Sequence, residues 1–227
     1  MKTTDLHQHF DVEYDKANVI SAYPSFLPEE KDIWLNKAYS MLLSQKFTGN
    51  NYRKIAFEGD IKRTSDLQRL IKTAPISTHT DASYVKNAIM FDLTLLSGYL
   101  YYIGSTVKLD GTNTSEVVLT SHILAQKVKE TDINKPWIPR PTAEIEDDNI
   151  ILYYDTIKYP TIPSNASINV TYLSNPSKID SISLPNAEIE VGDNVALEII
   201  NLAVVLALEN IESQRMETKG VTISMQE

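Results

Sequence analysis

Two histidines near the start of the chain have the residue type and spacing for metal chemistry. They lie in Asp5-Leu6-His7-Gln8-His9, with one residue between them. At the end of a strand, this spacing puts two imidazoles on the same side of the backbone, where both can bind one metal ion. The chemistry that such a pair indicates is metal-assisted hydrolysis.

The pair resembles the His-x-His of metal-dependent amidohydrolases, which implies a small metal-dependent hydrolase using His7 and His9. Those enzymes use a large barrel and further His and Asp ligands. This chain holds only His79 and His122 besides, and it is short for a complete (β/α)8 barrel. Nothing long enough precedes Asp5 to form a buried strand. The sequence therefore favours a solvated N-terminal arm and predicts no metal site.

Three other groups of side chains are better explained without a site. Acidic residues gather at a predicted hairpin tip, where charges are normally solvated: Glu144, Glu146, Asp147 and Asp148. Three tyrosines lack basic neighbours, so sheet packing suits them better than base stacking: Tyr99, Tyr101 and Tyr102. A modest basic helix, either a solvated face or a contact surface, carries Lys62, Arg63, Arg69 and Lys72. We find no Gly-rich phosphate loop and no Gly-x-Ser-x-Gly elbow. The sequence predicts a non-catalytic protein without a cofactor.

Composition limits the possible partners. The chain has 227 residues, of which 42% are hydrophobic, so it has enough apolar residues for a sizeable core. It lacks cysteine, which excludes disulfides, thiol nucleophiles and cysteine-ligated metals. The formal net charge of −9 argues against a broad phosphate-neutralising surface for nucleic acid. The N-terminus shows no apolar signal region, and no run of residues is long enough for a membrane span.

Helices are predicted at the two ends of the chain. Tyr23-Pro24 and Leu27-Pro28 disfavour helix before Pro28, which then begins a helix that ends near Gly49. Its predicted inward residues are Ile33, Trp34, Ala38, Met41, Leu42 and Phe47. A shorter helix is predicted from about Thr64 to Lys72. The long helix 193–218 should form the centre of the core, because Val195 to Leu208 is almost entirely apolar and Asp193 suits its N-cap.

The middle of the chain is predicted to form an antiparallel sheet. We expect strands at 85–93, 99–109, 116–120, 143–146, 150–154 and 167–173, with turns at Asp110-Gly111 and Asp147-Asp148-Asn149. A short helix is predicted from Ser121 to about Lys129, and a proline-rich connector from Pro136 to Pro141.

The fold class predicted is α+β, with the N-terminal and long C-terminal helices packed together and the sheet formed by the middle of the chain. We expect a single domain of residues 1–227. Its expected parts are an extended N-terminal arm (1–24), a helical part (28–73), a mainly β part (85–173), the long core helix (193–218) and a C-terminal tail (219–227).

Six stretches, in this order, resemble head-to-tail connector proteins (ring or adaptor proteins) of crAss-like short-tailed bacteriophages. They are Phe10–Asp15 with Ser25–Ala38, Asp66–Leu70, Tyr99–Val107, Asn134–Trp137 with Pro139 and Pro141, Ile168–Ile179, and Leu184-Pro185 followed by the helix that ends in Leu208–Arg215. The family's proline-containing lead-in to the tyrosine-rich strand is replaced here by Ser97-Gly98.

The resemblance implies a structural virion protein. Such proteins form rings of about twelve copies below the portal protein, contact other ring or tail proteins and extend the DNA channel between capsid and tail. An acidic lumen would repel phosphates and let DNA slide without sequence-specific binding. The protein would be made in the host cytoplasm and reside at the capsid–tail junction. A small monomeric protein-binding module is the remaining alternative.

Two contact surfaces are expected within that role. The tail residues Gly220, Val221, Thr222, Ile223, Ser224 and Met225 are predicted to contact the portal or a neighbouring subunit by adding a strand to a sheet edge. On the long helix, a more polar stripe at spacings of seven, four and three is predicted to face the lumen or a neighbour; its members are Glu198, Val205, Glu209 and Glu212. Residues 1–24 are expected to wrap a neighbour and to become ordered on assembly.

Overall fold

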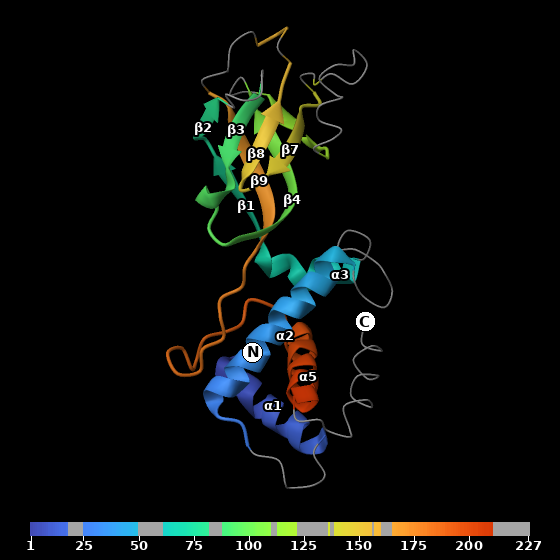
Figure 1. The fold of residues 1–227 in the computed structure, drawn as a ribbon, viewed down its shortest axis with the longest axis vertical. Helices are drawn as coiled ribbons and strands as arrows, with labels where there is room; N and C mark the ends of the chain where they lie inside the picture. Colours follow the sequence, from blue (N-terminus) through green and yellow to red (C-terminus); the bar gives the residue numbers. More distant parts are fainter. Residues whose placement is uncertain are drawn as a thin grey trace. The chain divides into compact units, whose positions relative to one another are not determined.

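The computed structural model of the chain describes residues 1–17, 25–49, 61–81, 88–109, 113–121, 136, 139–155, 157–159 and 165–210. The chain divides into two compact units where the sequence predicted a single domain. A helical unit comprises Met1–Leu70 and Pro176–Glu227, and a sheet unit comprises Ile71–Asn175. The sheet unit is thus an insertion in the sequence of the helical unit. The predicted α+β class is confirmed (Figure 1).

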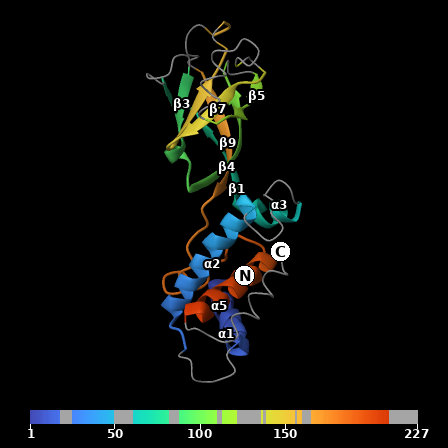
Figure 2. The same cartoon turned by 45° about the vertical axis from the view of Figure 1, so that its right-hand side comes forward.

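The helical unit contains helices from both ends of the described chain. They are α1 (Thr3–Ala17), α2 (Pro28–Thr48), α3 (Ile61–Leu67) with the 3-10 turn η2 (Gln68–Leu70), and α5 (Asp193–Asn210). The predicted packing of N-terminal helices against the C-terminal helix is confirmed, because α5 contacts both α2 and α1 (Figure 2). Within the described residues, no helix is long and apolar enough to cross a membrane.

Helix α5 is the core element that its apolar sequence predicts. Ten of its side chains are buried: Val195, Ala196, Ile199, Ile200, Leu202, Ala203, Val204, Leu206, Ala207 and Leu208. Burial of apolar surface on this scale is the main stabilising term for such a unit. Asp193, predicted as the N-cap, is instead the first helical residue, and its carboxylate accepts a hydrogen bond from the Met1 amine at 2.9 Å.

Helix α2 begins and ends where predicted, and Ala38 and Leu42 are buried as predicted, but the rest of its buried face differs from the predicted one. Pro28 starts it, and Gly49 ends it in the left-handed conformation with φ 75°. Ile33 and Met41, both predicted to be inward, are 63% and 38% exposed. The buried side chains are Asp32, Leu35, Ala38, Tyr39, Leu42, Leu43 and Lys46. The prediction was wrong for Ile33 and Met41, and it left out three apolar residues (Leu35, Tyr39 and Leu43) and two charged ones (Asp32 and Lys46).

Helix α1 contradicts the predicted extended arm over residues 3–17. Leu6, Phe10 and Tyr14 are buried and recur every fourth residue, so they form one face of a helix that packs on α5. The ring of Phe26 meets those of Phe10 and Tyr14 edge-on, with centroids 6.1 and 5.2 Å away. This burial gives α1 a place in the core of its own unit in place of the expected extended arm.

The sheet unit consists of two sheets. One has the strand order β1-β9-β4-β5 and the other β2-β3-β8-β7-β6. The strands are β1 (Ile71–Ile76), β2 (His79–Asp81), β3 (Ala88–Asp92), β4 (Tyr99–Lys108), β5 (Thr114–Glu116), β6 (Val118–Leu119), β7 (Thr142–Glu146), β8 (Asn149–Tyr153) and β9 (Ser167–Ser174), with the 3-10 turn η3 (Leu93–Leu95) after β3.

Both sheets are joined at each edge by a continuous piece of chain. Strand β1 leads through Ser77 and Thr78 into β2 of the other sheet, and β5 leads through Val117 into β6. Side chains from both sheets form one apolar core, in which Phe91, Val107, Ile150 and Ile168 are fully buried. The four-stranded and five-stranded sheets therefore enclose a common interior.

Most predicted strands are confirmed in position and pairing. Strands β4, β7, β8 and β9 match the predicted ranges within one or two residues, and β7 pairs with β8 as the predicted hairpin. The predicted helix through Lys72 is wrong, since Ile71–Ile76 is strand β1, paired antiparallel with β9. A proline is tolerated there because β1 is an edge strand. The predicted strand 116–120 divides into β5 and β6, and β6 pairs parallel with β7, so the sheet is not wholly antiparallel.

Several predictions concern residues outside the described ranges. They are the start of the strand at 85–87, the turn Asp110-Gly111, the helix from Ser121 to Lys129 beyond its first residue, the end of the long helix at 211–218 and the tail 219–227.

Candidate functional site

His7 and His9, the candidate metal ligands, do not form a common site. They lie on α1, two residues apart, so their side chains leave the helix about 200° from each other. The Nε2 atom of His7 lies 2.8 Å from Oδ1 of Asp32, and both side chains are nearly buried, whereas His9 is exposed. The two histidines are thus on a helix and not at the end of a strand; the expected solvated arm is wrong at His7, which ties α1 to α2.

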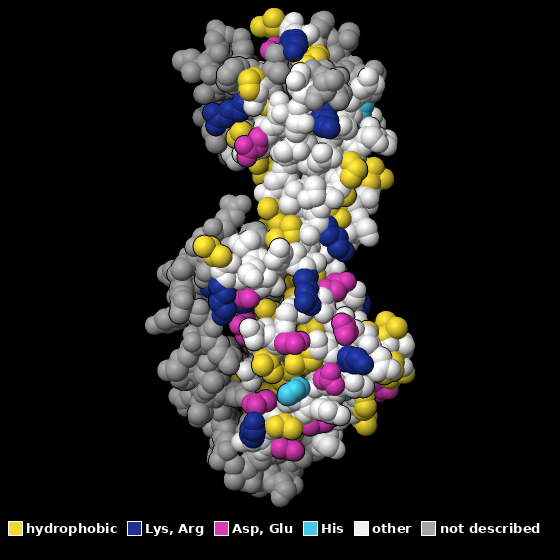
Figure 3. All heavy atoms as spheres, turned by 180° about the vertical axis from the view of Figure 1, so that it is seen from behind, with side chains coloured by type: hydrophobic (Ala, Val, Ile, Leu, Met, Phe, Trp, Pro, Cys, Tyr) yellow, Lys and Arg dark blue, Asp and Glu magenta, His cyan; other side chains and the backbone are white. Residues whose placement is uncertain are grey.

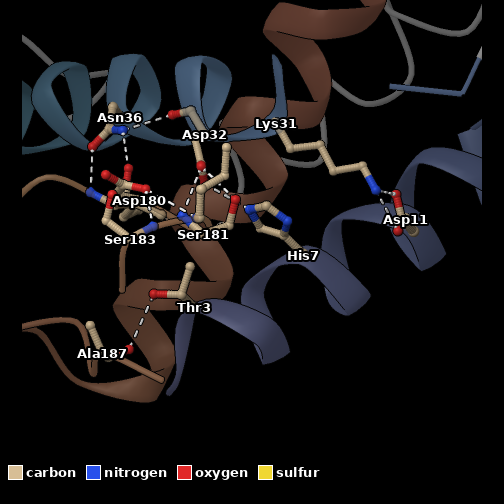
Figure 4. Close-up of polar contacts among 12 residues, drawn as sticks. Thr3, His7, Asp11, Lys31, Asp32, Asn36, Asp180, Ser181, Ser183 and Ala187 are labelled. Carbon is tan, nitrogen blue, oxygen red and sulfur yellow. Dashed lines mark hydrogen bonds and ion pairs between the residues drawn. The ribbon is translucent and has the colours of Figure 1, made fainter. Parts of the chain in front are cut away.

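Asp32 is the centre of a polar network that fixes the segment before α5. Besides contacting His7, it accepts hydrogen bonds at Oδ2 from the amide and the hydroxyl of Ser181, at 2.8 and 2.7 Å. One turn later on α2, the Asn36 side chain donates to the carbonyl of Ile179 and accepts from its amide, at 2.8 and 2.9 Å. Figure 4 shows these side chains converging between α1, α2 and the segment 179–183. A buried carboxylate with this many partners holds its surroundings in one arrangement.

The connecting segment 176–192 is held along most of its length. The carboxylate of Asp180 accepts from the amides of Ile182 and Ser183, at 3.0 and 2.8 Å, and hydrogen bonds from Ser183 keep its pKa below the ordinary value. The amide of Thr3 donates to the carbonyl of Ala187 at 3.0 Å. Even so, the tip of the segment exposes two large apolar side chains, Ile182 at 64% and Leu184 at 56%.

A second charged network joins α2, α3 and α5. The ammonium of Lys46 lies 2.9 Å from Asp66 and 2.7 Å from Glu198, and its side chain is only 7% exposed. Lys62 lies 3.6 Å from Glu198 on the more exposed side. Burial by itself lowers the pKa of Lys46, but its hydrogen bonds to Glu198 and Asp66 outweigh burial and raise the pKa above its ordinary value.

Glu198, the first residue of the predicted stripe on the long helix, is therefore not available as a free surface. Glu198 points to Lys46 within its own unit, because a buried ammonium requires a carboxylate partner. Val205 is partly buried and Glu209 is exposed, so the stripe reaches water only towards the end of α5. Glu212 and the tail residues Gly220–Met225 lie outside the described residues.

The predicted acidic cluster on the hairpin is split between the interior and water. Glu144 is 3% exposed and accepts a hydrogen bond from the Tyr153 hydroxyl, whereas Asp147 and Asp148 at the turn are exposed. The expectation of a fully solvated cluster is wrong for Glu144. Its side chain shares a sheet face with Tyr153, since alternate residues of adjacent strands point the same way.

The tyrosines of β4 take part in sheet packing, as predicted. Tyr99 and Tyr102 pack against the core between the sheets, and the ring of Tyr99 lies 5.8 Å from that of Tyr172. The Tyr102 hydroxyl lies 2.8 Å from that of Ser105. Burial raises the pKa of both Tyr99 and Tyr102.

A polar pocket of about 330 Å³ lies where α3 and η2 meet the start of α5. It is lined by Ser65, Asp66, Gln68, Arg69 and the residues Gly192, Asp193, Asn194 and Val195. Across the described residues, no three His, Cys, Asp or Glu side chains gather as metal ligands.

No protein-family model matches the chain, and no curated protein matches it in sequence. The two networks were also missed in the sequence, although each left a signal. Lys46 continues the core-facing spacing of α2 after Leu35, Tyr39 and Leu42, and Glu198 interrupts an apolar run. A cation and a carboxylate at core positions of two packed helices indicate a buried ion pair.

Proposed function

We propose that this chain is a structural virion protein, a subunit of the head-to-tail connector of a crAss-like short-tailed bacteriophage. In this role, about twelve copies form a ring beneath the portal protein, contact further ring or tail proteins, and extend the DNA channel at the capsid–tail junction. DNA would pass through the lumen without base-specific contacts. Catalysis and a cofactor have no part in the proposal.

The observation that carries the proposal is the order and mutual contact of the segments that resemble connector proteins. Six stretches occur in the expected order along the chain. Two of them, Ser25–Ala38 and Ile168–Ile179, meet through the paired hydrogen bonds between Asn36 and Ile179. Residues far apart in sequence that resemble the family thus form one structural contact.

The charges give further support. A formal net charge of −9 suits a channel wall that repels phosphate groups. Figure 3 shows basic and acidic side chains interspersed on the face that it displays, with no broad basic surface that would hold DNA. Two of the buried charged groups, Asp32 and Lys46, are engaged in joining elements of the helical unit. This pattern favours a structural role over a reaction site.

The test is assembly with the portal protein. The chain and the portal protein of the same phage are co-expressed, purified together and examined by electron microscopy and sedimentation velocity. The proposal requires a ring of this chain on one end of the portal. A chain that stays monomeric at every concentration and never docks would contradict it and would leave the binding-module alternative.

The hydrolase alternative has its own control. Metal content is measured for the wild type and for the double variant His7→Ala/His9→Ala. Stoichiometric metal in the wild type that is lost in the variant would favour the enzyme. The separation of His7 and His9 around α1 argues against that result.

A further inference from the structure

The segment 177–190, here called the loop, is held by hydrogen bonds and exposes two large apolar side chains at its tip. Asp32 and Asn36 anchor it from α2, and Asp180 closes its turn. The bonds to Asp32 and Asn36 are part-buried and those of Asp180 are exposed, and together they hold a segment without regular secondary structure. What it presents to water is Ile182 and Leu184, 64% and 56% exposed. A rigid loop loses little conformational entropy when its apolar side chains enter a partner, so such loops suit recognition.

The loop is acidic, and another surface of the same unit is basic. The loop carries one lysine against Asp180, Glu188 and Glu190, a formal charge of −2. The exposed charged side chains of residues 61–70, which form α3 and η2, are Lys62 and Arg69, a formal charge of +2; Arg63 is buried, and Asp66 pairs with Lys46. Among the described residues, this second surface also exposes a large apolar side chain, Ile61, at 90%. Each surface therefore combines exposed apolar groups with charge, and the charges are opposite.

These two surfaces lie on different sides of the helical unit. In Figures 1 and 2, the loop projects on one side of α2, and α3 lies on the other. A ring of identical subunits needs this arrangement, because each copy must offer one face to the copy before it and a different face to the copy after it.

We propose that the loop of one copy docks on the α3–η2 surface of the next copy, in a head-to-tail contact between copies of this chain. Ile182 and Leu184 would pack beside Ile61, and the acidic groups of the loop would face Lys62 and Arg69. The contact rests on the proposed ring function and specifies which surfaces build the ring. A second copy is the occupant that the charges favour, since both halves of the complementary pair are present on one chain.

The contact is tested with two charge-reversed versions of the full chain. The loop variant is Leu184→Lys/Glu188→Lys, which makes the loop basic. The α3 variant is Ile61→Glu/Lys62→Glu, which makes the α3–η2 surface acidic. A version with Ile61→Glu alone keeps the contact between Lys62 and Glu198, so it shows whether any effect comes from loss of that pair. Ile157→Lys, at a 91% exposed position in the sheet unit, is the matched control.

Self-association is measured by sedimentation velocity over a range of concentrations, with thermal unfolding of each variant as a check of the fold. Either variant alone places like charges against each other, so its self-association should weaken by about tenfold or more. A mixture of the two variants restores opposite charges at both contacts in an alternating ring. It should associate nearly as well as the wild type, and the Ile157→Lys control should match the wild type.

Two results would overturn the contact. In the first, both variants associate as the wild type does and form rings on the portal protein; the ring function then stands, but it uses other surfaces. In the second, the folded variants are each impaired and their mixture does not recover, which excludes pairing of the loop with α3–η2. A wild type that stays monomeric with and without portal protein would overturn the ring function together with this contact.

Discussion

Lys46 of α2 and Glu198 of α5 lie 2.7 Å apart, with side chains only 7% and 15% exposed. Asp66 of the α3 helix lies 2.9 Å from the same ammonium. One lysine therefore links three helices of the helical unit from inside its surface. If one partner were removed, the charge left behind would be unpaired. This would cost more unfolding free energy than at an exposed position, because little water reaches these groups.

Removal of the lysine should destabilise the helical unit. In Lys46→Met, Asp66 and Glu198 keep their charges without their shared partner, and the expected loss is about 3–5 kcal/mol of unfolding free energy. Urea unfolding followed by circular dichroism measures it. Lys37→Met is the matched control, since Lys37 is exposed and only its contact with the Trp34 ring is lost, a change of at most about 1 kcal/mol. Equal losses in both variants would contradict a special role for Lys46.

The same lysine should make stability depend on alkaline pH. Its folded pKa is raised above the ordinary value of 10.5, so the stabilising contribution is complete below about pH 10.5 and is lost as pH rises through the folded pKa. The difference in unfolding free energy between wild type and Lys46→Met should therefore be constant from pH 7 to 9 and shrink above about pH 10.5. A difference that stays constant at alkaline pH would show that the charge of Lys46 is not what stabilises the fold.

Two buried tyrosines should respond oppositely to loss of their hydroxyl. Among the described residues, the buried hydroxyl of Tyr39 has no hydrogen-bond partner, and burial, with the nearby charge of Glu190, raises its pKa. Tyr39→Phe removes this unsatisfied group, so stability should hold or rise by up to about 1 kcal/mol. In Tyr172→Phe, the bond from the hydroxyl to the Ser97 carbonyl is lost, and stability should fall by about 1 kcal/mol. Thermal and urea unfolding of the two variants decide the sign; a clear loss in Tyr39→Phe would indicate a partner for that hydroxyl.

Two glycines near β4 should also differ. Gly98 has φ +66°, where a Cβ is strained whatever the space around it, so Gly98→Ala should cost about 1–2 kcal/mol. A Cβ at Gly104 would meet nothing within 4 Å, and its φ is not in the left-handed region. Gly104→Ala should therefore be neutral or stabilising by up to about 1 kcal/mol. Similar unfolding midpoints for the two variants would rule out backbone strain at position 98.

The elements that the sequence predicted well are those whose pattern is complete within a short window. The apolar run from Val195, the proline at 28 with Gly49, and the alternation over Ser167–Leu173 each define an element without knowledge of its neighbours. Helix α1 was missed because the prediction followed the histidines and the prolines downstream. The repeat of Leu6, Phe10 and Tyr14 was present in the sequence, and it indicates a helix with one buried face.

Strand β1 and the charged networks could not be predicted from local sequence, because they are determined by contacts between distant residues. Ile71–Ile76 contains a proline and follows a helix, so only its pairing with β9, about a hundred residues later, makes it a strand. Asp32 meets Ser181 across 149 positions of sequence. A charged residue at a core position can be recognised from the sequence, but its partner is determined by how the helices pack.

The insertion of the sheet unit between Leu70 and Pro176 sets an order of events during synthesis. All residues of the sheet unit have been made before the ribosome reaches Asp193, the start of α5. At about 5–20 residues per second, α1 and α2 spend several seconds with their core-facing side chains uncovered while the sheet unit already has its full sequence. A nascent chain arrested before residue 193 therefore contains every residue of the sheet unit, whereas its helical unit lacks the central helix. Chaperone contacts on the nascent chain should concentrate on α1 and α2 until α5 emerges.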